Sequence, residues 1–232
     1  MRRKRMPRMR KPPRKNDVYK NLTNLPEREE YPMELYSFLE AMSSCAPTPG
    51  GGAATGYCGA LGTSLCAMVA KITAGNKKYA DVKEDMERLA AAADKHTASL
   101  YRFIDEDMKA FAPVSQAYTI PKDNPERDAI LERALLFACE PPMQVMLEVN
   151  EVLLVCEELA QKGSKMLLSD VACAAALSRA TLQCAFTNVK VNTRLLKNRD
   201  MAEKFDSEAL ELVSKGVERA EAVYRDVMEK MG

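Results

Sequence analysis

The sequence has few of the residues that usually build metal centres and cofactor sites. Its 232 residues include no tryptophan, a single histidine (His96) and only 6% aromatic residues. Seven cysteines are present, but none forms a Cys-x-x-Cys pair and none is spaced with His96 as a metal-ligand set. These absences exclude the common zinc-site patterns, so we expect no metal site. An odd number of cysteines, scattered on apolar helical faces, instead predicts reduced thiols in a reducing compartment such as the cytoplasm.

Long runs of bulky apolar residues are also missing. The basic N-terminal segment is not followed by the apolar segment of a secretory signal. The uncharged run from Ala53 to Ala70 has the length of a short membrane span, but it consists mostly of Gly, Ala, Ser, Thr and Cys. Such residues transfer poorly into a bilayer, so we expect no membrane span and interpret the run as a buried helix.

Excess positive charge is confined to the N-terminus. The chain has 34 Lys or Arg and 33 Asp or Glu, yet ten of the basic residues and one acidic residue fall within the first twenty positions. We therefore predict a disordered basic extension at residues 1–30 and a net acidic folded domain at residues 31–232. A net acidic body gives no reason to expect nucleic-acid binding. An RNA- or membrane-binding arm and a transit peptide are alternative interpretations of the extension.

The rest of the sequence is rich in helix-forming residues. From Tyr31 onward apolar residues recur with helical periodicity, and we find no convincing strand pattern. The pattern predicts a long helix from about residue 81 to 112 that ends or kinks at Pro113. At Pro141-Pro142 it predicts either two helices at an angle or one kinked helix, and it predicts a final helix over about 201–228. We therefore predict an all-α fold, a multi-helix bundle of about six to eight helices with no sheet.

The most informative segment is Pro47-Thr-Pro-Gly-Gly-Gly, a stiff approach to a bend that side chains would otherwise block. From there Gly52, Gly56, Gly59 and Gly62 follow at spacings of three and four residues, which places them on one face of a helix. Each glycine costs about 1 kcal/mol relative to alanine inside a helix, so a close neighbour must compensate. Another helix or a flat ligand would do so, and the two interpretations are compatible.

A second helix of small residues is predicted at 170–187, with Ser169-Asp170 as its N-terminal cap. We expect it to pack closely against the helix at 53–72, at the lower end of the usual separation of about 8–10 Å. We also expect this packing to leave room for a planar molecule near the N-terminal ends of both helices, where free N–H groups point outward.

Taken together, these segments resemble the cyclodeaminase/cyclohydrolase family of folate enzymes. That family includes the C-terminal domain of formimidoyltransferase-cyclodeaminase and stand-alone methenyltetrahydrofolate cyclohydrolases. The resemblance runs from about Met33 to Asn192 and is most specific in the Pro-x-Pro-Gly-Gly-Gly motif followed by Gly59-Ala-Leu-Gly. The further matching pieces are Met68-Val-Ala-Lys-Ile-Thr, Lys77-Lys-Tyr79, Asp105-Glu-Asp107, Ile120-Pro-Lys122, Pro142, Ser169-Asp170 and Asn188-Val-x-Val-Asn192. One departure is Gly163-Ser164, where the family often has Gly-Asn.

The resemblance implies an all-helical homodimer that acts on the one-carbon unit bridging the N5 and N10 atoms of tetrahydrofolate. Cyclodeaminases of the family convert 5-formiminotetrahydrofolate to 5,10-methenyltetrahydrofolate and release ammonia. Cyclohydrolases interconvert 5,10-methenyl- and 10-formyltetrahydrofolate with water. Neither reaction requires a metal or a redox cofactor. The sequence leaves open which of the two reactions this chain catalyses.

Asp107 is the best candidate for the proton transfer that both reactions require. It lies within one turn of Ile104 and Phe111 on the apolar side of the long helix. Burial there would raise the pKa of the carboxyl group toward the working pH. The alternative is that Asp107 is a solvated member of the acidic cluster Asp105-Glu106-Asp107.

Glycines and asparagines are candidates for the folate cleft. Gly50, Gly51 and Gly52 are expected to form part of it, together with the N-terminus of the following helix. Asn188 and Asn192 lie one turn apart on one helix face and could bond the edge of a pterin, which offers both donors and acceptors. Their structural alternative is a helix end or a polar bond between helices.

Charged residues are candidates for the rest of the substrate. Lys77, Lys78 and Lys122 could bind the carboxylates of the glutamate tail of folate, although lysines in loops are usually only solvated. Asp170 has a capping role that suffices to explain it, and a ligand role is the alternative. His96 has no evident partner in the sequence, and we interpret it as incidental to the chemistry.

A function of a different class stays open at this point. The chain could be a non-catalytic helical dimer, a scaffold with a vestigial folate pocket whose basic tail recruits an acidic partner or RNA. Turnover of folate derivatives by the purified protein distinguishes the enzyme from the scaffold.

Overall fold

The computed structural model describes residues 34–232, which form six α-helices and two short 3-10 helices. No strand occurs in that range, so the predicted all-α fold is confirmed. The predicted basic extension at residues 1–30 lies outside the described residues. Contacts divide the chain into two units, and the boundary in the sequence falls between Ser43 and Ser44. The described part of the first unit is helix α2 (Glu34–Met42) with the residue that follows it.

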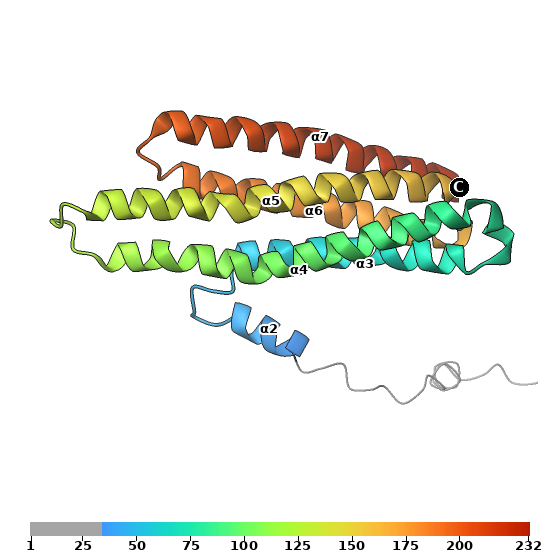
Figure 1. The fold of residues 1–232 in the computed structure, drawn as a ribbon, viewed down its shortest axis with the longest axis horizontal. Coiled ribbons are helices and arrows are strands. Elements are labelled where there is room, and N and C mark those ends of the chain that lie inside the picture. The colour runs from blue at the N-terminus through green and yellow to red at the C-terminus, as the bar shows by residue number, and fades with distance from the viewer. Residues whose placement is uncertain (1–33) are drawn as a thin grey trace, which may run out of the picture. The chain divides into compact units, whose positions relative to one another are not determined.

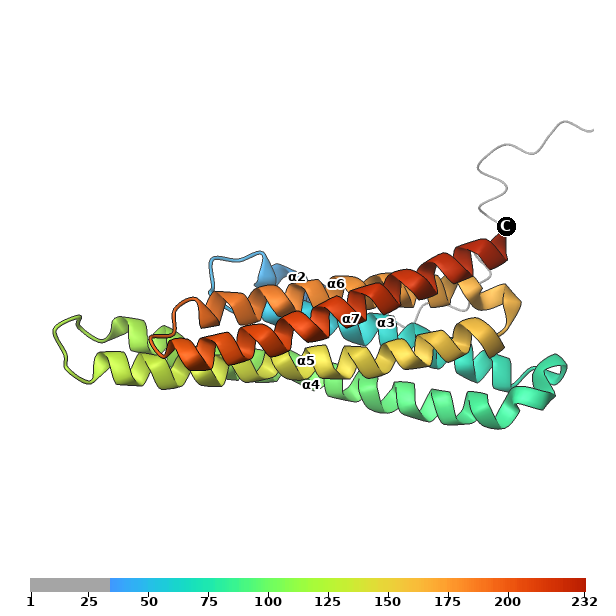
Figure 2. The ribbon, with the colours of Figure 1, turned by 90° about the horizontal axis from the view of Figure 1, so that it is seen from above.

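The second unit, Ser44–Gly232, is a bundle of five long helices. Successive helices run in opposite directions and are joined at the two ends of the bundle (Figure 1 and Figure 2). The 3-10 helices η1 and η2 lie at one end, where they lead into α4 and α6. The elements are α3 (Gly51–Ala74), η1 (Lys77–Val82), α4 (Lys83–Thr119), α5 (Arg127–Lys162), η2 (Lys165–Leu167), α6 (Leu168–Thr193) and α7 (Arg199–Met231).

The glycines of α3 let both α4 and α6 come close. A Cβ atom on Gly56 would lie 3.0 Å from the carbonyl oxygen of Leu100 in α4. A Cβ atom on Gly62 would lie 3.1 Å from the Cβ of Leu177 and 3.3 Å from the carbonyl oxygen of Ala174, both in α6. The expected close packing of the two small-residue helices is therefore confirmed. Helices compensate for the glycines over this part of the stripe.

Helices α3 and α6 run antiparallel, a relationship that the sequence does not reveal. Just before α6, Ser164 donates its backbone N–H to Thr73 near the end of α3. Near the end of α6, Asn188 donates to Thr55 near the start of α3. The N-terminal ends of the two helices therefore lie at opposite ends of the bundle. The expectation of one planar-ligand site near both N-terminal ends is wrong for a single chain.

Three prolines lie inside helices without ending them. Helix α4 continues through Pro113 to Thr119, and its last turns bury Val114 and Ala117 in the bundle. Helix α5 continues through Pro141 and Pro142 as a single helix, so of the two predicted alternatives the one with two separate helices is not observed. A proline has no N–H to donate, and Pro142 leaves the carbonyl of Ala138 without its helical partner. The side chain of Asn192 in α6 donates to that carbonyl at 2.8 Å.

Two helix ends differ from the prediction. Helix α6 begins at Leu168, so Asp170 lies in its first turn, and no side-chain hydrogen bond caps the helix at Leu167. The expectation that Ser169-Asp170 caps the helix is therefore wrong, although a carboxylate in the first turn still suits the helix dipole. Helix α7 is longer than predicted at both ends, and Asn198 caps it by accepting the N–H of Met201.

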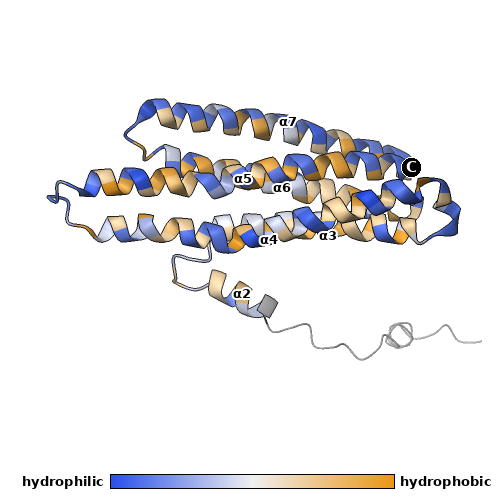
Figure 3. Ribbon diagram, in the orientation of Figure 1, coloured by the Kyte–Doolittle hydropathy of each residue, from blue (hydrophilic) through white to orange (hydrophobic). Residues whose placement is uncertain are grey.

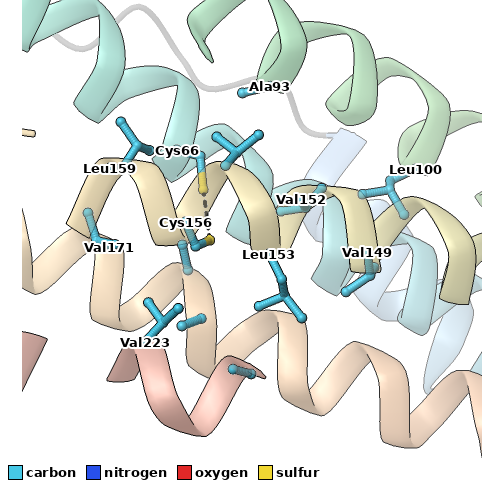
Figure 4. Packing of buried hydrophobic residues seen from close by; sticks show 14 of the residues in the cluster. Cys66, Ala93, Leu100, Val149, Val152, Leu153, Cys156, Leu159, Val171 and Val223 are labelled. Carbon is cyan, nitrogen blue, oxygen red and sulfur yellow. Dashed lines mark hydrogen bonds between the residues drawn. The ribbon is translucent and has the colours of Figure 1, made fainter. Parts of the chain in front are cut away.

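The core follows the length of the bundle around α5. Figure 4 shows Val149, Val152, Leu153 and Leu159 of α5 among buried side chains from the neighbouring helices. The Sγ atoms of Cys66 and Cys156, both fully buried, lie 3.4 Å apart in this core. Hydrophilic positions follow the outer side of α7 (Figure 3). The bulky side chains of α5 thus fill the centre of the bundle against the small residues of α3 and α6.

Helix α3 is unusual because it is apolar over nearly its whole length. By length and composition it is the one helix among residues 34–232 that could cross a membrane. In this bundle, 61% of its most apolar 18-residue window is buried inside the protein. The remaining part of that window faces outward.

Candidate functional site

The carboxyl group of Asp107 lies against the backbone at the start of α3. Asp107 is half-buried on α4, and the backbone N–H of Ala53 donates a hydrogen bond to its carboxylate. A Cβ atom on Gly52 would overlap the Oδ1, Cγ and Oδ2 atoms of Asp107. Any residue larger than glycine at position 52 would therefore displace the carboxyl group.

Of the three consecutive glycines, only Gly52 has a neighbour so close that no side chain fits at its position. A Cβ atom on Gly50 or on Gly51 would meet its nearest neighbour at 3.5 Å, an ordinary van der Waals distance. None of the three glycines has a positive φ. The expectation that side chains are blocked throughout this bend is therefore wrong for Gly50 and Gly51. Gly50 is the N-cap residue of α3, with an extended backbone.

Burial raises the pKa of the Asp107 carboxyl above its ordinary value, and the hydrogen bond from Ala53 partly opposes the rise. The cause is desolvation, because the charged form loses the stabilisation of water. The direction is the one expected from the apolar side of the long helix. A carboxyl group whose pKa is moved toward neutrality can accept a proton and return it near neutral pH.

A small cavity lies beside this carboxyl, among side chains and backbone of α3, α4, α5 and α6. Its volume is about 10 Å³, enough for a single water. The lining residues are Gly52, Thr55, Phe103, Asp107, Pro141, Pro142, Val145 and Asn188. The expected space for a reduced pteridine beside the glycines is not present in the single chain, because the Asp107 carboxyl fills the position next to Gly52.

Asn188 connects the end of α6 to the start of α3. Its Nδ2 donates to the hydroxyl oxygen of Thr55 at 3.3 Å and to the carbonyl of Cys184 at 3.0 Å. The hydroxyl of Thr55 in turn donates to the carbonyl of Gly51 at 2.6 Å. These hydrogen bonds hold the Asn188 amide in the wall of the Asp107 cavity.

Asn192 lies one turn further along α6 but has a different partner. Its Nδ2 donates to the carbonyl that Pro142 leaves free, that of Ala138. The two asparagines share one helix as expected, yet only Asn188 lines the cavity. Asn192 makes the bond between helices that the sequence left as its structural alternative, and its role in substrate binding stays a prediction.

Lys77 and Lys78 lie far from Asp107 in the same chain. They follow α3 in η1, whereas Gly52 is at the start of α3. A helix rises 1.5 Å per residue, so Gly52 and Lys77 are separated by roughly 37 Å. Asp170, in the first turn of α6, lies toward the same far end.

Lys122 is on the other side of Asp107, in the exposed turn between α4 and α5. Along α4, Thr119 lies twelve residues beyond Asp107, a distance of roughly 18 Å. The described structure therefore brings together Asp107, Gly52 and Asn188, with Gly51 close by, and leaves the three lysines apart from them.

Several lysines gather where η1, the end of α5 and the start of α6 meet. They line a cavity of about 550 Å³ that also includes the Tyr79 ring. Lys162 pairs with Asp85 and Glu158 there, whereas no ion pair among residues 34–232 involves Lys78 or Lys165. Lys78 and Lys165 line this cavity, whereas Lys77, the residue before Lys78, lines a different one with Lys71 and Lys83.

Some residues that line the Asp107 cavity were not identified from the sequence. Thr55 and Phe103 are one turn from Gly52 and Asp107, so their helical register could have indicated them. Pro141 and Val145 could not have been found in this way. They come from α5, and only the tertiary packing brings that helix beside Asp107.

His96 has a partner, contrary to the expectation from the sequence. Its Nδ1 lies 2.5 Å from Oε2 of Glu148 in α5, and both side chains are largely buried. A partner more than fifty residues away is invisible to local pattern. The pair lies three turns from Asp107 along α4, away from the cavity. Within residues 34–232, no group of three or more His, Cys, Asp or Glu side chains is placed to hold a metal ion.

Comparison with known proteins gives consistent matches over most of the chain. A family model described as formiminotransferase-cyclodeaminase matches residues 34–211. A methenyltetrahydrofolate cyclohydrolase from Methylorubrum extorquens is 34% identical over 199 residues, 84% of this chain and 96% of that protein. The formimidoyltransferase-cyclodeaminase of Rattus norvegicus is 29% identical over 77% of this chain and 34% of its own length. The crystal structure of a formiminotetrahydrofolate cyclodeaminase from Thermotoga maritima matches with a TM-score of 0.73 and 32% identity, over 84% of this chain and 94% of that one.

Proposed function

Because this chain belongs to the formiminotransferase-cyclodeaminase family, we propose that it is a folate one-carbon enzyme in which Asp107 transfers the protons. Its substrates are tetrahydrofolate derivatives with a one-carbon unit at N5 and N10, and its activity is that of a cyclodeaminase or a cyclohydrolase. The observation that carries the role of Asp107 is its half-buried carboxyl group, which is held against Gly52 and Ala53 and has a raised pKa.

Both reactions pass through a tetrahedral carbon and need a proton moved from one heteroatom to another. In the cyclohydrolase direction, water adds to the methenyl carbon while the Asp107 carboxylate accepts a proton from it. The protonated carboxyl then donates to N5 as the carbon–N5 bond breaks, and the new hydroxyl group loses its proton to water as it becomes the carbonyl of 10-formyltetrahydrofolate. Proton transfer by a positioned group typically contributes about 10²–10⁴-fold to the rate.

In the cyclodeaminase direction the same group acts on a different leaving group. N10 attacks the formimino carbon, whose exocyclic nitrogen is already protonated as =NH2⁺, and Asp107 accepts the N10 proton. The protonated carboxyl then donates to the exocyclic nitrogen, which leaves as ammonia as the methenyl bridge forms. One carboxyl group therefore serves either reaction, and the choice depends on which substrate the cleft orients.

The remaining candidates have supporting roles in this proposal. Asn188, fixed by Thr55, bonds the pterin edge, Gly50 and Gly51 let the ligand approach the start of α3, and Gly52 makes room for the Asp107 carboxyl. Proton transfer alone suffices for both reactions, so we propose that the enzyme needs neither a metal nor a redox cofactor. We further propose that it works as a homodimer in the cytoplasm, where its cysteines stay reduced.

Absorbance of 5,10-methenyltetrahydrofolate tests the proposal directly. Purified protein should accelerate the loss of this chromophore if it is a cyclohydrolase, or its formation from 5-formiminotetrahydrofolate if it is a cyclodeaminase. Asp107→Asn should remove either activity, and dialysis against a chelator should leave it unchanged. If the protein changes neither rate and folates do not raise its melting temperature, the scaffold interpretation replaces the enzymatic one.

A further inference from the structure

The hydroxyl group of Thr55 is buried in the wall of the Asp107 cavity, and its single proton already has an acceptor. It donates that proton to the carbonyl of Gly51, one turn back along α3, at 2.6 Å. A hydroxyl group has one proton to donate and two lone pairs that accept. Toward any other neighbour, the Thr55 oxygen therefore acts only as an acceptor.

The side-chain amide of Asn188 meets two such acceptors. Its Nδ2 lies 3.3 Å from the hydroxyl oxygen of Thr55 and 3.0 Å from the carbonyl oxygen of Cys184. Neither oxygen has a proton to give to the amide, so an amide turned by 180° would place its own oxygen against both of them. The nitrogen must therefore face these two acceptors, and both of its protons are used there.

The oxygen of the same amide is left for a ligand. Asn188 Oδ1 lies 3.5 Å from the position that a Cβ atom on Gly51 would take, and no residue among 34–232 donates a hydrogen bond to it. Asn188 and Asp107 line one cavity. A free asparagine amide can both donate and accept. Because its two protons are used, the Asn188 amide offers a ligand in this cavity an acceptor only.

We propose that Thr55 is a positioning residue, which orients the Asn188 amide so that it offers the substrate only its oxygen, and that this oxygen accepts a hydrogen bond from N3–H of the pterin ring. The identity of the substrate rests on the proposed function, whereas the orientation of the amide does not. Thr55 acts through Asn188 by setting which kind of group the pterin must present there.

The order of the side chains along the start of α3 selects the N3–H group. The Asp107 carboxyl lies against Gly52, and the Asn188 amide lies against the preceding residue, Gly51. In a tetrahydropterin the C4 carbonyl is next to N5, which carries the one-carbon unit, and N3–H follows the carbonyl along the same edge of the ring. If Asp107 acts beside N5, this edge extends toward Asn188.

The backbone between the two side chains suits the C4 carbonyl in the middle of that edge. The N–H of Ala53 donates to the carboxylate of Asp107. The N–H groups of Gly51 and Gly52 precede it and have no partner within α3, as in the first turn of any helix. Backbone donors next to the acceptor of Asn188 complement a C=O group next to an N–H group, which is the lactam edge of the pterin.

Hydrogen exchange of the Asn188 side chain tests the orientation without any ligand. In nitrogen-15-labelled protein, Asn188→Leu identifies the two amide protons by the loss of their signals. Both should exchange with water about tenfold or more slowly than those of the exposed Asn124, and Thr55→Val should release one of them. Thr55→Ser keeps the hydroxyl group and should keep both protected. Two rapidly exchanging protons in the wild type, or an unchanged rate in Thr55→Val, overturn the fixed orientation.

Binding of 5-formyltetrahydrofolate, measured by calorimetry, tests the effect on the ligand. This folate has the same pterin edge as either substrate. Asn188→Leu should weaken its binding by about tenfold, and Thr55→Val by about threefold. Asn188→Asp keeps an acceptor and should bind more tightly than Asn188→Leu. Equal binding by these two variants of Asn188 contradicts an acceptor role for the residue.

A threonine elsewhere on α3 gives a matched control. Thr63 is also buried and donates to the carbonyl one turn back, that of Gly59, at 2.8 Å, but it lies eight residues beyond Thr55 and outside the cavity. Thr63→Val should leave the dissociation constant unchanged. If it weakens binding as much as Thr55→Val, the loss comes from the helix in general and the positioning role is overturned.

A double-mutant cycle tests whether Thr55 acts through Asn188. Thr55→Val should weaken binding in the wild type and have no further effect in an Asn188→Leu background. The same loss in both backgrounds overturns the positioning role. In turnover, Thr55→Val should raise KM and leave kcat within about twofold, since the bond to N3–H is present in the ground state and the transition state alike.

A second cycle tests which pterin atom is bound. The 3-methyl derivative of 5-formyltetrahydrofolate has no N3–H and should bind the wild type about tenfold more weakly than the parent compound. In Asn188→Leu the ratio of the two dissociation constants should fall toward one. A ratio that is the same in Asn188→Leu as in the wild type overturns the assignment of N3–H.

Failure of this inference differs from failure of the proposed function. If the wild-type protein neither turns over folates nor binds 5-formyltetrahydrofolate, the proposed function and the N3–H contact both fail. Hydrogen exchange then still supports or overturns the orienting role of Thr55. If the wild-type protein turns over a folate and the effects of Thr55→Val and Asn188→Leu are additive, the positioning role fails and the function stands.

Discussion

Gly52 of α3 and Asp107 of α4 fit together so closely that one added methyl group would overlap the carboxyl. Gly52→Ala should therefore push the carboxyl away from Ala53 and lower kcat by about 100-fold, at the low end of what acid–base catalysis contributes. Steady-state kinetics measures the effect. Gly75→Ala is the control, because its Cβ would meet its nearest neighbour at 3.6 Å. A kcat within twofold of wild type for Gly52→Ala would show that the carboxyl position is not critical.

Asp107→Asn should stabilise the protein at neutral pH while it removes activity. The pKa of Asp107 is raised by burial from the ordinary value of 3.8. A group with a raised pKa favours folding below its unfolded value and loses that contribution as the pH rises through the folded value. Asparagine does not titrate. The melting temperature of Asp107→Asn should therefore gain on wild type as the pH rises from 4 toward 8, as measured by thermal denaturation. A difference that is constant with pH would contradict the raised pKa.

Asn192 should stabilise the fold through its hydrogen bond to the carbonyl of Ala138. Asn192→Ala leaves the carbonyl of Ala138 without a donor and should cost about 1–3 kcal/mol of unfolding free energy. Pro142→Ala restores a backbone N–H that can donate to that carbonyl. Asn192→Ala should therefore cost less in a Pro142→Ala background, and a double-mutant cycle by urea denaturation measures the difference. Additive effects of the two changes would show that the hydrogen bond contributes little.

Thiol reactivity should separate the buried cysteines from the others. Cys66, Cys139 and Cys156 are buried and free. Burial raises the pKa of Cys139 to about 12, and the contact with Cys66 together with burial raises that of Cys156. The reagent cannot reach a buried sulfur, and the thiolate is the reactive form, so the three buried thiols should be unreactive toward a disulfide reagent at pH 8 until the protein is unfolded. Rapid reaction of all seven cysteines in the folded protein would contradict the packing around α5.

Local sequence pattern was enough for the fold class and for part of the site. Apolar periodicity without strands predicts helices, and the spacing from Gly52 to Gly62 predicts a close helix neighbour. The position of Asp107 beside Ile104 correctly indicates that its carboxyl group is desolvated. These features depend on residues within a few turns of one another, which is the range that helical periodicity reports.

Features that depend on distant contacts could not be read from the sequence. Helix α5 passes through Pro142, and Asn192, fifty residues later, supplies a donor to the freed carbonyl. Helix α3 is antiparallel to α6, so the N-terminal ends of these two helices, which we expected at one ligand site, lie at opposite ends of the bundle. His96 pairs with Glu148, which lies on another helix. In each case the deciding interaction joins elements whose pairing is a property of the folded bundle.

The glycine-rich helix α3 also fixes a distance along the bundle. It sets how far the Asp107 carboxyl group, beside Gly52 at one end, lies from Lys77, which follows the other end. The loss of one residue from the middle of α3 would rotate the rest of the helix by about 100° and shorten it by about 1.5 Å. The contacts at one end or the other would then be lost. Natural variation in length should therefore be tolerated in the turns at 120–126 and 194–198 and be absent from the interior of this helix.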